Sequence, residues 1–285
     1  MRTLVTGATG FTGEHVVKEL LLQGSHQVVA FVRQDNKTTW LREQGVSIYA
    51  GDLTDQASLQ AALQGVEVLL NVASLGFGHA ANIVAAAEAA RVRRAVFVST
   101  TAIFTRLHTE SKYERLEAER LIQESQLRYT ILRPTMIYGT PRDRNIWRLI
   151  NYLRHWPIIP VVGRGRALQQ PVYVEDVAQA IIKCVSSDKA IGRIYNLAGS
   201  APLSFLELID TVCQHLKRSV SRLHIPVTTA QITARLLHPL GLSVTPEQVQ
   251  RLNEDKTFDI SPARSDLCYT PLSFSEGVTR EIAYL

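Results

Sequence analysis

Short apolar runs alternate with longer amphipathic segments along the first half of the chain. The runs are apolar over their whole length, which is typical of strands buried on both faces; they span residues 2–6, 27–32, 46–50, 66–72, 95–99 and 129–132. The segments between them repeat apolar residues at helical spacing; they span residues 14–23, 55–63, 80–90 and 114–124. Strands that alternate with helices form parallel sheets, so this half predicts an α/β fold with a Rossmann-type doubly wound parallel sheet.

The rhythm changes after Gly139, where prolines and arginines become frequent. The pattern predicts helices joined by irregular pieces, over residues 176–185, 205–216, 229–237 and 246–252. It also predicts two more strands, Val172–Val174 and Arg193–Leu197, that rejoin the main sheet. We therefore expect a sheet domain over residues 1–139, completed by residues 167–198. A smaller, helix-rich carboxyl-terminal lobe would occupy most of residues 140–285.

Composition narrows the class of protein. Of the 285 residues, 46% are hydrophobic and 20% charged, as in ordinary soluble domains. The net charge of +5 and the pI of about 9.2 are too mild to indicate a nucleic-acid partner. No secretory signal is visible and no run approaches the roughly 18 apolar residues of a membrane span, which favours a cytoplasmic protein without membrane contact. The three cysteines form no CxxC pair and the histidines no HxH or HExxH pattern, so we expect no metal site.

A glycine-rich loop, Thr6-Gly7-Ala8-Thr9-Gly10-Phe11-Thr12-Gly13, connects the first strand to the first helix. Gly7 permits a tight turn with positive φ. Gly10 lets a diphosphate approach the backbone, and Gly13 lets the helix pack close to the strand. The free N–H groups and the dipole of the helix start favour an anion. The loop therefore predicts dinucleotide binding, with Thr9, Phe11 and Thr12 among the contacts.

Several segments together carry a family resemblance. The loop TGATGFTG is joined by Gly51-Asp52-Leu53 after the third strand, by Ser99-Thr100-Thr101 at the fifth, and by the runs LRPTMIYG and PVYVEDVA at residues 132–139 and 171–178. The chain thus resembles, over essentially its whole length, the extended and atypical short-chain dehydrogenase/reductases, the group of the NAD(P)-dependent epimerases and dehydratases.

The resemblance implies an NAD(P)-dependent oxidoreductase, epimerase or dehydratase acting on a carbonyl or hydroxyl carbon of a sugar or nucleotide sugar. Residues 1–139 would bind the dinucleotide and residues 140–285 mainly the substrate. The resemblance also implies a homodimer formed through the helices near residues 80–90 and 114–124. It implies contacts with the adenine, ribose, diphosphate and nicotinamide from Asp52, Leu53, Asn71, Ala73 and Pro134.

The end of the second strand bears on the choice of cofactor. Arg33 follows that strand, where a guanidinium could grip the 2′-phosphate of NADP with two hydrogen bonds. Asp35 lies two residues further on and could accept hydrogen bonds from the ribose hydroxyls of NAD. We predict NADP as the preferred cofactor, with NAD as the alternative.

The catalytic pattern of this family is incomplete in the chain. The family uses a Tyr with a Lys four residues later, whose ammonium lowers the pKa of the phenol, and a Ser or Thr after the fifth strand. Thr101 matches the Ser/Thr, but an alignment without gaps places Ser111 and Arg115 at the Tyr and Lys positions. A second alignment, with three extra residues, places His108 at the Tyr position.

Three hypotheses follow from this departure. Tyr113 and Lys112 could supply the proton and the ribose contact from shifted positions, although Glu117 follows Tyr113 by four residues and would raise the pKa of its phenol. His108 with Lys112 could do so, because a histidine titrates near neutral pH. Otherwise the proton relay is absent, and the protein is an unusual enzyme or a dinucleotide-binding scaffold or redox-sensing module with little turnover.

Six arginines with one acidic residue lie between positions 142 and 166. Arginine forks suit a diphosphate, and the region follows the sixth strand, so it should lie over the cofactor. We therefore predict substrate contacts from Arg142, Asn145, Arg148 and Gln170. A solvated basic face would give the same composition.

Overall fold

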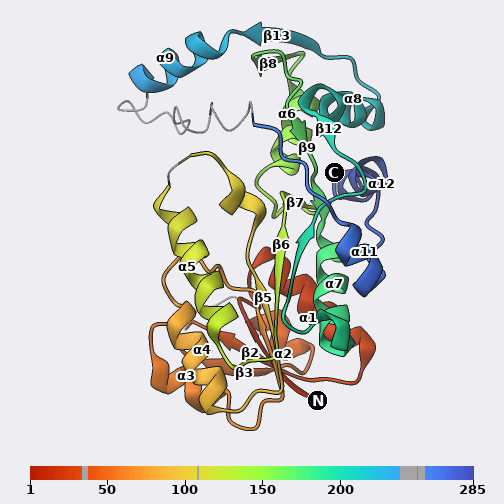
Figure 1. The fold of residues 1–285 in the computed structure, drawn as a ribbon. Coiled ribbons are helices and arrows are strands. Elements are labelled where there is room, and N and C mark those ends of the chain that lie inside the picture. Colours follow the sequence, from red (N-terminus) through yellow and green to blue (C-terminus); the bar gives the residue numbers. More distant parts are fainter. Residues whose placement is uncertain (34–37, 108, 238–248, 250–253) are drawn as a thin grey trace.

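The computed structural model describes residues 1–33, 38–107, 109–237, 249 and 254–285. Its centre is a sheet of seven parallel strands in the order β11-β6-β5-β4-β1-β2-β3 (Figure 1). The strands are β1 (Arg2–Thr6), β2 (Gln27–Val32), β3 (Ser47–Ala50), β4 (Val68–Asn71), β5 (Arg94–Val98), β6 (Tyr129–Pro134) and β11 (Arg193–Leu197). The strand order reverses between β1 and β4, and ligands bind at the carboxyl edge of such a point. The predicted doubly wound fold is confirmed.

Helices cover both faces of this sheet, because successive side chains of each strand point to opposite sides. Leu4 packs with α3 (Gln56–Ala62), α4 (Ala80–Ala89) and α5 (Glu110–Glu124). Val5 packs on the other side, in the cluster that includes α1 (Phe11–Gln23), α2 (Thr39–Glu43), α7 (Val174–Ser186) and α11 (Ser261–Leu267). Figure 1 shows α3, α4 and α5 on one side of the sheet and α1, α7 and α11 on the other.

The second half forms a smaller lobe above the carboxyl edge of the sheet (Figure 1). Its helices are α6 (Ile146–His155), α8 (Phe205–Leu216), α9 (Val227–Leu237) and α12 (Phe274–Ile282). Its short strands pair as β7 (Ile137–Tyr138) with β10 (Val172–Tyr173), β9 (Leu168–Gln169) with β12 (Leu203–Ser204), and β8 (Ile158–Val162) with β13 (Ser221–Ile225). A separate apolar core around Tyr138, Ile150, Leu208 and Phe274 holds this lobe together.

One prediction about this region needs correction. Of the two expected extra strands, only β11 joins the main sheet, beside β6. The strand predicted at Val172–Val174 pairs with β7 instead, because it is two residues long and α7 begins directly after it at Val174. The helix predicted over residues 246–252 lies outside the described residues, apart from Val249.

The start of one helix also differs from the prediction. α5 begins at Glu110, one turn before the predicted start, because the first turn is polar and gives no apolar signal. In the part of the chain that the structure describes, no helix combines the length and apolarity that a membrane crossing requires.

Candidate functional site

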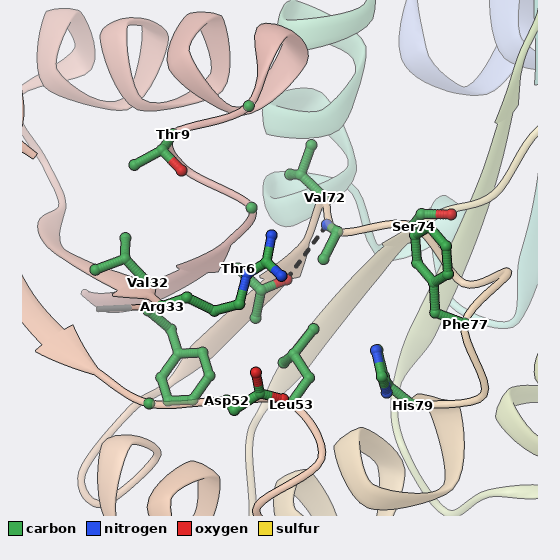
Figure 2. A pocket seen from close by; sticks show the side chains of 15 residues that line it. Thr6, Thr9, Val32, Arg33, Asp52, Leu53, Val72, Ser74, Phe77 and His79 are labelled. Carbon is green, nitrogen blue, oxygen red and sulfur yellow. Dashed lines mark hydrogen bonds between the residues drawn. The ribbon is translucent and has the colours of Figure 1, made fainter. Parts of the chain in front are cut away.

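The glycine loop forms one wall of a cavity of about 610 Å³ at the switch point of the sheet (Figure 2). Gly7 has a φ of +70°, and a Cβ there would lie 2.8 Å from the backbone nitrogen of Ala73. A Cβ on Gly13 would lie 2.0 Å from the carbonyl oxygen of Gly7, so only glycine lets α1 start this close to β1. No side chain in the described residues caps α1 at Gly10, which leaves N–H groups of its first turn available to an anion. The tight turn of the loop and the available N–H groups at the start of α1 together fit the diphosphate of a dinucleotide.

The far wall of the cavity comes from the ends of β2 and β3. Figure 2 shows Arg33 extending into the cavity above Asp52 and Leu53. The N–H and the hydroxyl of Thr54 donate to Asp52 at 2.8 and 2.7 Å. These hydrogen bonds hold the pKa of Asp52 below its ordinary value, and the charges of His79 and Arg33 add smaller effects in the same direction. The cavity therefore presents an ionised carboxylate beside a guanidinium.

Asn71 shapes the opposite wall without lining the cavity. It is fully buried; its amide oxygen accepts from the hydroxyl of Thr6 at 2.7 Å, and its amide nitrogen donates to the carbonyl of Ala73 at 3.1 Å. Both polar atoms of its side chain are thus used to hold the turn after β4. Ala73, which that turn positions, does line the cavity.

Two aromatic residues of this wall were not found from the sequence. Phe77 is 72% exposed although it is large and apolar, and its ring lies 6.3 Å from that of His79. Both side chains border the cavity (Figure 2). An exposed phenylalanine beside a glycine loop is a signal for a flat ligand such as adenine, but the run from Ser74 to His79 has no periodicity that would have indicated it.

Most predicted cofactor contacts meet around this cavity. Gly7, Thr9, Gly10, Arg33, Asp52, Leu53 and Ala73 line it. Thr12 and Pro134 line a neighbouring cavity of about 270 Å³, which shares Val72 and Ser74 with the first. Phe11 instead packs edge-on against His15. Asp35 lies outside the described residues.

A third cavity, of about 720 Å³, continues from the second and lies between the sheet domain and the carboxyl-terminal lobe. The two share Thr100, Ala102 and Thr135. Its remaining walls are the 3-10 turn η1 (Thr101–Phe104) with its continuation to Arg106, together with Met136, Asn145, Gln169 and residues 254–258. Three adjoining cavities therefore run from the glycine loop to a space between the lobes, as a cofactor and a substrate would require.

The wall of this third cavity is built by contacts between distant segments. Glu254 accepts a hydrogen bond from the hydroxyl of Thr105 at 2.9 Å and one from the backbone nitrogen of Arg106 at 3.1 Å. The rings of Phe104 and Phe258 lie 5.7 Å apart. The cavity thus combines apolar rings with two cationic residues, Arg106 and Lys256, and two acidic ones, Glu254 and Asp255.

The predicted catalytic residues point in different directions. Thr101 is among the residues that line the third cavity, and its hydroxyl donates to the carbonyl of Pro134 at 3.3 Å. Arg115 lines the second cavity: its guanidinium lies against Gly76 and donates to the carbonyl of Ser111 at 2.7 Å. Lys112 is turned to the carbonyl of Thr105, at 2.7 Å.

The hydroxyl candidates on α5 do not reach these cavities. Tyr113 is 51% exposed, and neither it nor the exposed Ser111 is among the cavity-lining residues. His108 lies outside the described residues. Arg115, the residue that the gap-free alignment placed at the Lys position, is the one that faces the second cavity.

The predicted substrate contacts are spread over the lobe. Asn145 lines the third cavity. Arg148 is exposed on α6 and lines none of the described cavities. Arg142 contacts Thr9 and Glu14 on the cofactor side.

Gln170 is buried, with both ends of its amide occupied. Its nitrogen donates to the carbonyl of Gly199 at 2.8 Å, and its oxygen accepts from the backbone nitrogen of Phe258 at 3.0 Å. The side chain therefore joins two backbone segments, and the neighbouring Gln169 is the one that borders the third cavity.

A buried ion pair lies beneath the end of β5 and the turn that carries Thr101. Glu119 is 1% exposed and pairs with Arg133, and it accepts a hydrogen bond from Ser99 at 2.5 Å. The guanidinium of Arg133 also lies 5.2 Å from the ring centre of Phe104. This network fixes the end of β5 and the turn that carries Thr101. Within the described residues, no group of three or more His, Cys, Asp or Glu side chains is arranged to hold a metal ion.

Comparison with known proteins agrees with this geometry. A family model described as NAD(P)H-binding matches residues 7–188. Quinone oxidoreductase 2 of Escherichia coli K12 is 31% identical over 234 residues, covering 76% of this chain and 75% of that protein. A subunit named NADH dehydrogenase [ubiquinone] 1 alpha subcomplex subunit 9, from Dictyostelium discoideum, is 25% identical, covering 79% of this chain and 66% of that protein.

A solved structure with the same fold is UDP-glucuronic acid 4-epimerase of Bacillus cereus in complex with NAD. Its TM-score is 0.79 at 19% identity, and the match covers 100% of this chain and 98% of that one. The similarity extends through both lobes, so the two chains share the arrangement of sheet domain and carboxyl-terminal lobe.

Proposed function

Because the chain belongs to the NAD(P)H-binding family and has the fold of the epimerase/dehydratase-type extended short-chain dehydrogenase/reductases, we propose that it is an NAD(P)-dependent oxidoreductase. It would act on a carbonyl or hydroxyl carbon held in the third cavity. The observation that carries this proposal is the continuous series of cavities from the glycine loop, past Thr100 and Thr135, to the space between the lobes. A bound nicotinamide cofactor supplies the hydride.

The chain's own residues would hold that cofactor in a defined order. The N–H groups at the start of α1 would bind the diphosphate. Asp52 and the rings of Phe77 and His79 would contact the adenosine end, and Arg115, in the second cavity, would place a cation beside the nicotinamide half. Thr101 would orient the substrate oxygen.

Arg33 favours NADP over NAD in this proposal. Its guanidinium extends into the cavity from the end of β2, where the ribose of the adenosine would lie (Figure 2). A planar guanidinium can form two charge-assisted hydrogen bonds with a phosphate. Asp52 would still accept a hydrogen bond from the base, since its carboxylate is held ionised.

A phosphorylated or nucleotide-linked sugar is one candidate substrate. The third cavity is large enough, at about 720 Å³, and Arg106, Asn145 and Lys256 would bind the anionic part of such a molecule. The two carboxylates of this cavity already accept hydrogen bonds from the protein, Glu254 from Thr105 and Asp255 from the backbone nitrogen of Leu168. Thr101 and Thr135 would face the sugar carbon that exchanges the hydride.

A quinone is a second candidate, because its reduction does not require a proton donor positioned by the protein. Reduction of a quinone to a hydroquinone consumes one hydride and one proton, and the oxygen anion formed after hydride transfer is stabilised by the ring. It can take its proton from water, so no positioned acid is needed. Within the described residues, no tyrosine lines the three cavities. The rings of Phe104 and Phe258 offer such an acceptor an apolar surface, and a 31% identical relative carries the name quinone oxidoreductase.

Two measurements test the proposal. The first is calorimetric titration of the protein with NADPH and NADH, for the wild type, for Arg33→Ala and for Arg42→Ala, an exposed arginine of α2 that lines none of the described cavities. Arg33→Ala should weaken NADPH binding at least about tenfold and NADH binding less than about twofold. Equal effects on both cofactors would refute the preference for NADP, and a wild type that binds neither cofactor would refute the function.

The second measurement is the oxidation of NADPH, followed by its absorbance, with a panel of quinones and 4-keto nucleotide sugars. Turnover with one class identifies the substrate type. Tight cofactor binding without turnover across both classes would instead favour a dinucleotide-binding scaffold or redox-sensing module, the role consistent with the missing Tyr-Lys pair.

A further inference from the structure

Arg142 joins the carboxyl-terminal lobe to the glycine loop. It lies in the connection between β7 and α6, and its guanidinium donates to the carbonyl of Thr9 at 2.8 Å. The same guanidinium forms an ion pair with Glu14, in the first turn of α1. These partners are more than 120 residues away in sequence, so the contact exists only because the two lobes are placed together.

The carboxylate of Glu14 lies where the diphosphate of a dinucleotide would bind, and the two negative charges would repel each other. The start of α1 attracts anions, and both the cofactor's diphosphate and the carboxylate of Glu14 would occupy that region. Burial raises the pKa of Glu14, but Lys18, Arg142 and His15 together hold it below its ordinary value, so the side chain is an anion at neutral pH. An uncompensated carboxylate there would repel the diphosphate.

Two cations compensate Glu14, and they differ in how they are held. Both side chains are about half exposed, at 51% for Lys18 and 47% for Arg142, and Lys18 lies one turn along α1, at 2.6 Å. Arg142 approaches from the other lobe and binds the loop carbonyl at the same time. Its neighbour Asp143 is buried and accepts hydrogen bonds from the backbone nitrogens of Asn145 (2.6 Å) and Trp147 (3.1 Å), which fixes the backbone next to Arg142.

We propose that Arg142 is a positioning residue for the dinucleotide: it neutralises Glu14 and holds the carbonyl of Thr9, so that the start of α1 keeps its full attraction for the diphosphate. This inference rests on the proposed function. It assigns to the cofactor side a residue that the sequence placed on the substrate side. Asn145, three residues further on, lines the third cavity, so the same short connection reaches both ligands.

Cofactor titration of the full-length protein tests this proposal. Arg142→Ala should weaken NADPH binding about tenfold, the size expected for one charge at a helix start. Arg142→Lys keeps the charge and should stay within about threefold of the wild type. Arg144→Ala is the matched control, because Arg144 is an exposed arginine of the same connection that lines none of the described cavities; it should bind like the wild type.

The decisive variant is the double substitution Arg142→Ala with Glu14→Gln. If Arg142 acts by neutralising Glu14, removal of that carboxylate should restore most of the lost affinity. A merely structural role predicts a lower melting temperature and no recovery. NADPH affinity of Arg142→Ala within twofold of the wild type, or no recovery in the double variant, would overturn the inference while leaving the proposed function intact. A wild type that binds neither pyridine nucleotide would overturn both.

Discussion

Replacement of Glu281 by glutamine should make the protein more stable at neutral pH. Glu281 lies in α12 and is 0% exposed; its carboxyl lies beside that of Asp143, and the backbone N–H of Gly139 favours its charged form by less than burial opposes it. Burial raises its pKa to about 10, and the neighbouring carboxyl of Asp143 acts in the same direction. The folded protein therefore keeps this residue as a neutral acid, whereas the unfolded chain ionises it near its ordinary pKa of 4.5.

The size of the effect follows from this difference in proton binding. The folded state binds one more proton than the unfolded state between pH 4.5 and about 10, so the contribution of Glu281 to stability is complete below 4.5 and is lost as the pH rises through that window. By pH 7 the loss amounts to about 3 kcal/mol. Glutamine has the same shape and no proton to release, so Glu281→Gln should escape this loss.

Urea denaturation at a series of pH values from 4 to 9 measures the effect. The stability of Glu281→Gln relative to the wild type should rise steadily across the series, by about 3 kcal/mol between pH 4 and 7. Glu124→Gln, at an exposed ion pair on α5, serves as the control and should show less than about 1 kcal/mol of change. Parallel pH profiles for Glu281→Gln and the wild type would refute the reasoning.

Two further substitutions test how the site is built. Gly13→Ala would place a Cβ 2.0 Å from the carbonyl oxygen of Gly7, so α1 must move and NADPH affinity should fall at least about tenfold in calorimetry; unchanged affinity would contradict the close approach described for this loop. Glu119→Ala leaves the guanidinium of Arg133 without its carboxylate partner and should lower the free energy of unfolding by about 3–5 kcal/mol in urea; a loss below 1 kcal/mol would mean that the pair does not hold the end of β5 in place.

The sheet could be predicted from the sequence because its signals are local. Most strands are short, mainly apolar runs, and the glycine loop directly follows the first of them. The strand at β10 was placed in the wrong sheet because two residues carry no information about their partner. Only the contact with β7, itself two residues long, decides where it pairs.

The candidate site was less predictable because its walls come from distant parts of the chain. Thr105 and Glu254 are separated by 149 residues, and neither residue type indicates the hydrogen bond that joins them. Phe77 was missed for a different reason, since only its exposure in the folded protein distinguishes it from an ordinary core residue.

The periodicity of α5 bears on the hypothesis that a shifted Tyr-Lys pair supplies the proton relay. Adjacent helical residues point about 100° apart, so Lys112 and Tyr113 cannot face one cavity together, whereas Ser111 and Arg115 share a face. Arg115 lies in the second cavity and Lys112 is turned to the carbonyl of Thr105. Among the described residues, the helix thus places a cation, but no phenol, at the three cavities. A protein built this way would favour acceptors whose oxygen is stable as an anion after hydride transfer. A quinone meets this requirement, because its ring stabilises the anion, whereas a sugar carbonyl does not.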